Sequence, residues 1–207
     1  MNTMLQTGNS KLSTSVGIFN LPEGKTCPGR TPFCAEVCYA KRRRCKKGGR
    51  NDKVSAFRES NRLKSLSDSF VNDIVREIRF LGVSKVRIHE SGDFYSQEYL
   101  DKWIRIAERC PDVTFLAYTR CFDILNFSDV PSNMIVYHSF DPTSRRTPRA
   151  DERAAFLVPS GSSAAEVAPG YFVCPAKIMK KKRIHNYCGT LCKRCWTSSP
   201  RIAFAKH

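Results

Sequence analysis

Seven of the ten cysteines in this 207-residue chain form two closely spaced groups, one toward each end of the sequence. Thiolates separated by only a few residues can bind one soft metal centre, because a turn or a single helical turn brings their sulfur atoms together. The spacing therefore predicts two metal or iron–sulfur sites. The first group consists of Cys27, Cys34 and Cys38, and the second consists of Cys174, Cys188, Cys192 and Cys195.

The two groups differ in their number of thiolates, and the difference has a chemical meaning. Three thiolates leave one iron of a 4Fe-4S cluster open to a substrate or cofactor, whereas four thiolates close a structural or electron-transfer site. We therefore expect reactivity at the first group and support or electron supply at the second. Two alternatives stay open. Cys45 could complete the first group, and the second group could bind zinc, with His185 able to replace one thiolate.

Cys110 and Cys121 stand apart from both groups and are expected to be buried thiols without a ligand role. The sequence starts without a long apolar run and contains no stretch of about 18 apolar residues, so it predicts neither a signal peptide nor a transmembrane helix. We therefore expect a cytoplasmic protein with no membrane partner. The reducing cytosol favours metal ligation by the thiols over disulfide formation.

The chain is strongly basic, with a formal net charge of +16. Clustered lysines and arginines attract phosphate backbones through counterion release. The charge therefore predicts nucleic acid as a partner, without reading of its sequence, because no nucleic-acid-binding motif accompanies it. Alternatively, the charge keeps the protein soluble or offsets the negative charge of a thiolate-bound cluster. The basic runs occupy residues 41–47, 145–149 and 180–183.

Helix and strand patterns alternate between the two cysteine groups. An apolar stripe from Leu63 to Leu81, with Phe80 assigned to the core, predicts one bent helix or two, ended by Gly82. Ser96 is placed to cap a further helix. Runs rich in β-branched and aromatic residues predict strands at 83–89, 113–119, 134–140 and 171–173, and a short helix is expected near 151–156.

This alternation predicts an α/β fold with a small, mostly parallel sheet, right-handed crossovers and flanking helices. We expect a single domain over residues 1–207. Its parts are an irregular cysteine-containing segment at 1–50, an α/β core at 51–173, and a cysteine-rich segment at 174–207.

Polar residues follow three of the predicted strands. In open α/β sheets, ligands bind at the carboxyl ends of parallel strands, so we expect these residues to share one edge. We predict that Gly92 lets a ligand approach the backbone, and that Asp93 accepts hydrogen bonds from an ammonium or hydroxyl group. With Ser91, they form the expected cofactor-binding turn. The other residues placed at this edge are Arg120, Ser139 and Asp141.

Two residues of this region are the candidates for a catalytic role. His89 lies beside the turn and could act as a proton donor or a ligand, and Asp93 could take part in proton transfer. The alternative is that the Gly92-Asp93 pair only begins the next helix.

The succession of motifs resembles a phage protein family called gene product eighty-eight, found in tailed phages and prophages. The resemblance spans nearly the whole chain and implies a phage-encoded protein of the host cytoplasm. The motifs that carry it are residues 9–12, 27–29, 34–40, 87–94, 118–120 and 174–176, with Tyr99, Trp103 and the closing cysteines before Trp196.

A more distant likeness implies chemistry. Residues 83–119 resemble the second βαβ unit of radical S-adenosylmethionine enzymes, in which a Gly-Gly-Glu-like turn holds the methionine amino group. Residues 91–93 take that place, and Cys38-Tyr39 is similar to the last cluster ligand and its aromatic neighbour. The cysteine spacing differs from the Cys-x3-Cys-x2-Cys of that superfamily. The likeness also implies that the sheet is a reduced form of a partial (β/α) barrel.

The leading hypothesis is an iron–sulfur protein with one or two 4Fe-4S clusters. If catalytic, it would be a radical S-adenosylmethionine-like enzyme that acts on or near nucleic acid and receives electrons from a donor protein. One alternative is a zinc-stabilised basic protein that binds nucleic acid without catalysis. The other is a non-catalytic iron–sulfur protein for redox sensing or electron transfer.

Overall fold

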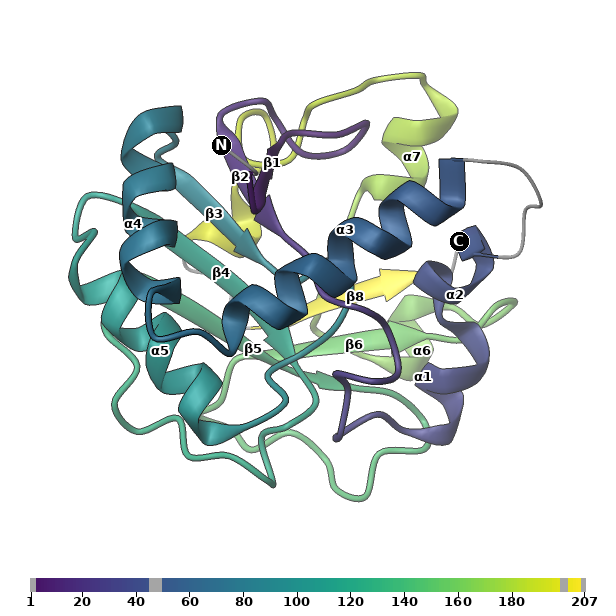
Figure 1. Ribbon diagram of the computed structural model, residues 1–207. Coiled ribbons are helices and arrows are strands. Elements are labelled where there is room, and N and C mark those ends of the chain that lie inside the picture. Colours follow the sequence, from purple (N-terminus) through teal and green to yellow (C-terminus); the bar gives the residue numbers. More distant parts are fainter. Residues whose placement is uncertain (1–2, 45–49, 198–200, 206–207) are drawn as a thin grey trace.

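The computed structural model describes residues 3–44, 50–197 and 201–205 and has an α/β architecture (Figure 1). Within these residues, eight strands form one sheet in the order β1-β2-β3-β4-β5-β6-β8-β7. Only β1 and β2 pair in antiparallel fashion, and the other neighbours are parallel. The order follows the chain from β1 to β6, as in a partial (β/α) barrel. The predicted α/β class with a mostly parallel sheet is confirmed.

The strands are β1 (Leu5–Thr7), β2 (Val16–Phe19), β3 (Lys85–Ile88), β4 (Thr114–Thr119), β5 (Met134–Phe140), β6 (Ala154–Val158), β7 (Phe172–Val173) and β8 (Arg201–Ala205). The helices are α1 (Pro32–Val37), α2 (Tyr39–Arg44), α3 (Arg50–Ser65), α4 (Phe70–Leu81), α5 (Gln97–Glu108), α6 (Ala164–Val167) and α7 (Ala176–Lys181). A short 3₁₀ helix, η1, covers Arg194–Trp196.

Both ends of the chain contribute strands that the sequence did not predict. The N-terminal segment supplies β1 and β2, and β8 from the C-terminal segment pairs with β6 and β7. The expected short helix near 151–156 is wrong, because β6 occupies 154–158. β2 and β6 are four and five residues long, and their buried positions do not alternate along the strand, so the sequence gives no period from which they could be recognised.

Different segments cover the two faces of the sheet. Because successive side chains of a strand point to opposite faces, Phe115 and Leu116 of β4 belong to separate cores. On the first face, α4 and α5 pack side by side against the sheet (Figure 1). Phe70 and Trp103 meet there edge to face, with 5.7 Å between ring centroids. On the second face, the C-terminal segment packs through Tyr187 and its neighbours.

The helix signals were only partly reliable. The stripe forms two helices, α3 and α4, and Gly82 ends α4 in the left-handed conformation, with φ of 60°. Ser96 caps α5 by accepting a hydrogen bond from the Tyr99 N–H, as predicted. The assignment of Phe80 to the core is wrong, because this side chain is 77% exposed. Leu63 and Leu66 of the predicted stripe are exposed as well.

Helix α3 buries polar side chains in place of that stripe. The Asn61 Nδ2 amide donates to the carbonyl oxygens of Met4 and Asn20, at 3.0 and 3.1 Å. The Arg58 guanidinium lies 3.5 Å from the Glu23 carboxylate, with both side chains nearly buried. This face packs on irregular backbone whose carbonyl groups need donors, so its buried residues are polar and no apolar pattern marks them.

The turn after β3 holds the N-terminal cysteine segment in place. The Ser91 Oγ hydroxyl donates to the Leu21 carbonyl at 2.9 Å, and the Leu21 N–H donates back to the Ser91 carbonyl at 2.9 Å. The Asp93 N–H donates to the Thr26 carbonyl at 3.0 Å. Gly92, with φ of 87°, lies so close to this segment that an added Cβ would be 2.5 Å from the Leu21 Cβ. The backbone at Gly92 is therefore closely approached, but by the Leu21 side chain of the same protein.

Gly92→Ala should destabilise the fold more than the same change at Gly161. Both glycines have positive φ, which costs an alanine about 1–2 kcal/mol. Only Gly92 is also crowded, and overpacking adds about 1–3 kcal/mol. The free energy of unfolding from denaturant titration measures both effects. Equal losses in the two variants would contradict the packing of residues 21–26 on this turn.

Candidate functional site

Asp93, Arg120 and Asp141 follow β3, β4 and β5 and meet at one edge of the sheet. The Arg120 N–H donates to Asp93 Oδ2 at 2.8 Å, and the Arg120 guanidinium lies 2.7 Å from Asp141 Oδ2. Parallel strands bring their carboxyl ends to a common edge, and these contacts confirm the predicted edge for the three residues.

The ion pair between Arg120 and Asp141 is almost fully buried, since the two side chains are 10% and 0% exposed. A buried pair is stable only when its remaining polar atoms are satisfied. Asp141 Oδ1 accepts from the N–H and the hydroxyl of Thr143, each at 2.8 Å, and Arg120 also donates to the Ser139 carbonyl at 3.3 Å. The pair is therefore a fixed element of the sheet edge.

Helix α1 of the first cysteine group is attached to this ion pair. The Thr31 hydroxyl caps α1 by accepting from the Cys34 N–H at 3.0 Å, and it donates to Asp141 Oδ2 at 2.5 Å. Gly29 lies against the backbone of Arg120, where an added Cβ would be 2.2 Å from the carbonyl oxygen. The loop from Cys27 to Cys34 thus sits directly on the carboxyl ends of the strands.

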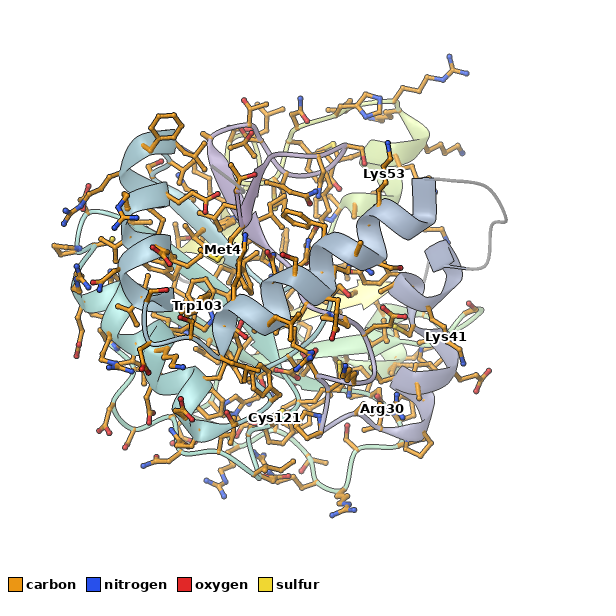
Figure 2. The ribbon with its side chains drawn as sticks, in the orientation of Figure 1. Met4, Arg30, Lys41, Lys53, Trp103 and Cys121 are labelled. Atoms are coloured by element: carbon orange, nitrogen blue, oxygen red, sulfur yellow. The ribbon has the colours of Figure 1, made fainter. Side chains whose placement is uncertain are left out.

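The three thiols of the first group line one cavity of about 370 Å³. Its polar lining includes the Glu23 carboxylate and the side chains of Arg30 and Lys41. Figure 2 labels Arg30 and Lys41 on the side of the molecule where α1 and α2 lie. The structure therefore places Cys27, Cys34 and Cys38 around one cavity, and metal binding by them stays a prediction, whereas Cys45 lies outside the described residues.

Burial dominates the acidity of these thiols. It raises the pKa of Cys27 to about 12, with a smaller contribution in the same direction from the Asp93 carboxylate. Burial also raises the pKa of Cys34, and the adjacent Arg120 guanidinium opposes that rise. Without a metal, the Cys27 and Cys34 thiols are therefore protonated at neutral pH. The neutral Cys27 thiol supports folding below about pH 9, and this contribution is lost as the pH rises toward 12.

The turn expected to bind a cofactor is engaged inside the protein. The Asp93 carboxylate accepts from the N–H groups of Phe94 and Arg120, at 2.7 and 2.8 Å, and burial raises its pKa to about 6. Asn20 Oδ1 accepts from the Ser91 N–H at 2.9 Å. The polar groups of Ser91 and Asp93 thus contact the chain itself, and cofactor binding at residues 91–93 stays a prediction.

Cys121 is fully buried, as the sequence predicted, but its place at this edge was not foreseen. Its thiol contacts the Asp93 carboxylate and the Gly29 N–H, and burial raises its pKa to about 12. It lies beneath the first cysteine group, and its position after Arg120 was the only signal that could have placed it there. Cys110 is buried in the core with α4 and α5, as expected of a thiol without a ligand role.

His89 has the surroundings of a core histidine. Its Nε2 lies 2.8 Å from the Tyr99 hydroxyl, and its ring packs against Phe19 and Phe94. Burial lowers its pKa to about 3, so the ring is neutral at physiological pH. Its Nδ1 is buried without a hydrogen-bond partner among the described residues, and its φ of 62° is unusual for a non-glycine residue. A catalytic role for His89 stays a prediction.

The second cysteine group forms a looped structure on the second face of the sheet. The Cys188 N–H donates to the Lys11 carbonyl at 3.0 Å, which ties the loop to the N-terminal segment. The Gly189 N–H donates to the Cys192 carbonyl, and the Cys192 N–H donates to the Tyr187 carbonyl, each at 2.9 Å. Cys174 joins from β7, where its N–H donates to the Ala203 carbonyl of β8.

The four thiols of this group differ in exposure, since Cys188 and Cys195 are buried and Cys174 and Cys192 are partly exposed. Burial raises the pKa of the Tyr187 phenol to about 12, and the nearby thiols of Cys174, Cys188 and Cys192 reinforce this rise. Burial likewise raises the pKa of the Cys195 thiol to about 11. Nearby, the indole N–H of Trp196 is buried beside the Cys188 thiol.

Cationic and aromatic side chains of the sheet lie beneath this second group. The Tyr118 hydroxyl contacts the Cys195 thiol, and the Arg87 guanidinium lies close enough to lower the pKa of that thiol. Arg87 stacks over the Tyr118 ring at 4.1 Å, and Tyr118 stacks on Tyr137 at 5.1 Å. An arginine of the sheet therefore accompanies each cysteine group.

The end of β4 lies between the two groups. Tyr118 contacts Cys195 of the second group, and Arg120, two residues further along, contacts Cys34 of the first. A strand rises about 3.3 Å per residue, so only a short length of backbone separates the two contacts. The sequence placed the groups 136 residues apart between Cys38 and Cys174, and it offered no sign of this proximity.

In the described ranges, no three histidine, cysteine or acidic side chains converge closely enough to hold a single metal ion. Across those same residues, none of the helices has the length and apolar character needed to cross a membrane.

Arg120→Gln should lower the free energy of unfolding by about 3–5 kcal/mol, because it leaves the Asp141 carboxylate buried without its counter-ion. The double variant Arg120→Gln with Asp141→Asn should lose less than the sum of the two single variants, since neither charge is then uncompensated. Denaturant unfolding of the four proteins measures the coupling. Additive losses would show that the pair does not act as a unit.

Comparison with known proteins supports the resemblance noted in the sequence, and the match extends along almost the whole chain. Residues 2–198 match the family described as Gene product 88. The chain is 29% identical to the Gene 88 protein of Mycobacterium phage D29, over 88% of this chain and 84% of that protein. It is 30% identical, over the same shares, to the Gene 88 protein of Mycobacterium phage L5. No solved structure matches the chain. The chain therefore belongs to the gene product 88 family of phage proteins.

Proposed function

We propose that this protein binds a 4Fe-4S cluster through Cys27, Cys34 and Cys38. One observation carries the proposal, namely that these three thiols line a single cavity at the carboxyl edge of a parallel sheet. Ligands of α/β proteins collect at that edge, and the cavity of about 370 Å³ falls within the roughly 300–1,000 Å³ of small-molecule sites.

The donor set fits an iron–sulfur centre. Thiolates are the usual ligands of such clusters, and each thiolate binds its own iron, so the three sulfurs need to surround a space and not meet at one point. The arrangement around the cavity supports this geometry. The cluster would supply one-electron redox chemistry and one iron without a protein ligand. Glu23, Arg30 and Lys41 supply charges of both signs to a molecule bound in the same cavity.

Arg120 is suited to support a negatively charged centre. Its guanidinium lies beside Cys34 and is held in place by Asp141, so a positive charge stays next to the thiolate in both redox states. Nearby charge and hydrogen bonds to sulfur set the reduction potential of a cluster. We infer that Arg120 raises the potential of this centre.

For the second group we propose a closed site of four thiolates, either a second 4Fe-4S cluster or zinc. Its sulfurs are gathered around Tyr187 on the face of the sheet, and the end of β4 links this group to the first. An iron–sulfur cluster there would serve electron supply, and zinc would serve stability. Metal content distinguishes the two.

We do not extend the proposal to S-adenosylmethionine. The turn at residues 91–93, which the distant likeness to radical enzymes implies as the cofactor site, uses its polar groups to hold the N-terminal segment and the backbone of Arg120. Nucleic acid is the partner that we propose, and the net charge of +16 supports it.

Anaerobic reconstitution should give a brown protein that retains iron and sulfide in equal amounts, about four of each per occupied site. The triple variant with serine at Cys27, Cys34 and Cys38 should lose the iron and sulfide of the first site. Cys110→Ser changes a buried thiol outside both groups, so it is the matched control and should retain all of the iron and sulfide. A colourless protein that retains only zinc would favour the alternative function, and retention of neither metal would refute both.

Metal binding at the first group should strengthen as the pH rises. Burial raises the pKa of Cys27 to about 12 and also raises that of Cys34, so cluster assembly must displace the protons of these thiols. We expect the amount of cluster retained after anaerobic reconstitution, followed by thiolate-to-iron charge-transfer absorption, to rise with pH through the neutral range. Cys27→Ser should weaken this pH dependence. Cluster retention that is independent of pH would exclude thiolate ligation.

A further inference from the structure

The C-terminal part of the chain carries positive charge without any acidic residue. Between 167 and 207 the sequence contains no aspartate or glutamate, whereas the rest of the chain contains all 19. The same stretch contains nine lysines and arginines, which are Lys177, Lys180, Lys181, Lys182, Arg183, Lys193, Arg194, Arg201 and Lys206. This segment of the chain is therefore strongly cationic.

The lysines of α7 share one face of that helix. Lys177, Lys180 and Lys181 stand at positions i, i+3 and i+4, which are neighbours on a helix surface. All three are exposed. Ile178, on the adjoining side of the helix, is 60% exposed as well.

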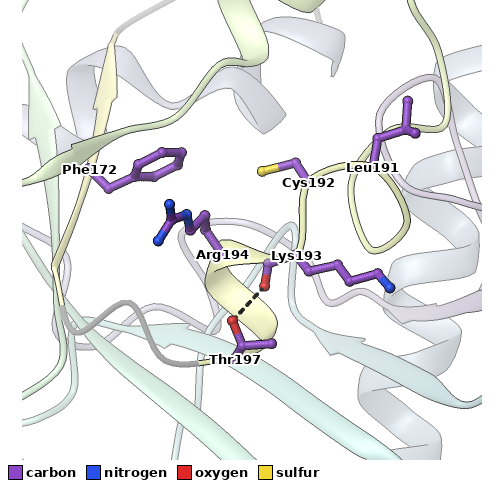
Figure 3. A pocket seen from close by; sticks show the side chains of 6 residues that line it. All are labelled: Phe172, Leu191, Cys192, Lys193, Arg194 and Thr197. Carbon is purple, nitrogen blue, oxygen red and sulfur yellow. Dashed lines mark hydrogen bonds between the residues drawn. The ribbon is translucent and has the colours of Figure 1, made fainter.

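A cavity of about 430 Å³ has Phe172 in its lining, and this residue precedes the start of α7 by four positions. Arg194 lies over the Phe172 ring, with its Cζ 5.2 Å from the ring centroid. Figure 3 shows Phe172 and Leu191 on opposite sides of the cavity, with Arg194 and Cys192 between them. Leu191 is 77% exposed. The lining residues are Phe172, Leu191, Cys192, Lys193, Arg194 and Thr197.

We propose that this surface, the cavity at Phe172 and Arg194 together with the lysine face of α7, binds single-stranded nucleic acid. The ring and the guanidinium plane offer stacking surfaces to a base, and the lysines neutralise neighbouring phosphates. Only unpaired bases expose their faces for stacking, so a single strand fits this surface better than a duplex. The inference rests on nucleic acid as the proposed partner and does not depend on the identity of the bound metal.

The test uses the full-length protein as purified, with its metal content measured, and fluorescein-labelled oligothymidylate or a hairpin duplex as the probe. Fluorescence anisotropy gives the affinity at several salt concentrations. Phe172→Leu should weaken single-strand binding roughly tenfold without changing the salt dependence, because it removes stacking and no charge. Phe80→Leu on α4 is the control, since it removes an even more exposed ring elsewhere, and should bind as the unchanged protein does.

A second set of measurements tests the role of positive charge with two double variants. Lys180→Gln with Lys181→Gln should weaken binding and reduce the slope of log affinity against log salt by about 1.4, or about 0.7 for each phosphate that is no longer neutralised. Arg76→Gln with Arg79→Gln on α4 removes the same charge from another face and should change the slope little.

Each outcome other than those expected contradicts a different part of the proposal. If the oligonucleotide binds but Phe172→Leu has no effect, or if the duplex binds as tightly as the single strand, the stacking surface is refuted. Equal effects of the two double variants would mean that net charge alone attracts the strand. No binding even at low salt would refute nucleic acid as the partner, and the iron content of the same sample decides the metal proposal separately.

Discussion

The buried ion pair between Arg120 and Asp141 is the interaction on which the candidate site depends. Asp141 fixes the Thr31 hydroxyl that caps α1, and Arg120 places its backbone against Gly29 and its guanidinium beside Cys34. The loop that carries the first cysteines therefore takes its position from two residues at strand ends. A buried pair of this kind costs desolvation and gives little net stability, which suits a role in positioning.

The sheet also explains how two distant cysteine groups come together. β2 and β8 bring the ends of the chain into the same sheet as the core strands, and the alternation of side chains along β4 then decides which group meets which residue. Tyr118 points to the face covered by the C-terminal segment, whereas Arg120 lies past the end of the strand at the carboxyl edge. One strand thus serves both groups.

The features that the sequence predicted depend on local rules, and those it missed depend on distant partners. The strands β3, β4 and β5, the cap at Ser96 and the left-handed Gly82 follow from neighbouring residues. The polar face of α3 could not be foreseen, because Asn61 is buried only by the backbone of residues that precede it by more than forty positions. Similarly, no local feature of the sequence showed that Leu21, and not a ligand, would occupy the space beside Gly92.

The positive charge of the chain has two distinct physical settings. Arg87 and Arg120 are largely shielded by the protein and lie beside thiols, where a charge interacts strongly because little water screens it. The lysines of α7 are exposed, where salt screens them and only a polyanion binds them together. Composition alone cannot separate these settings. It left two rival explanations of the net charge, namely that the cations offset the charge of a bound cluster or that they contact nucleic acid. Different residues suit each explanation, so the two proposals are compatible and can be tested independently.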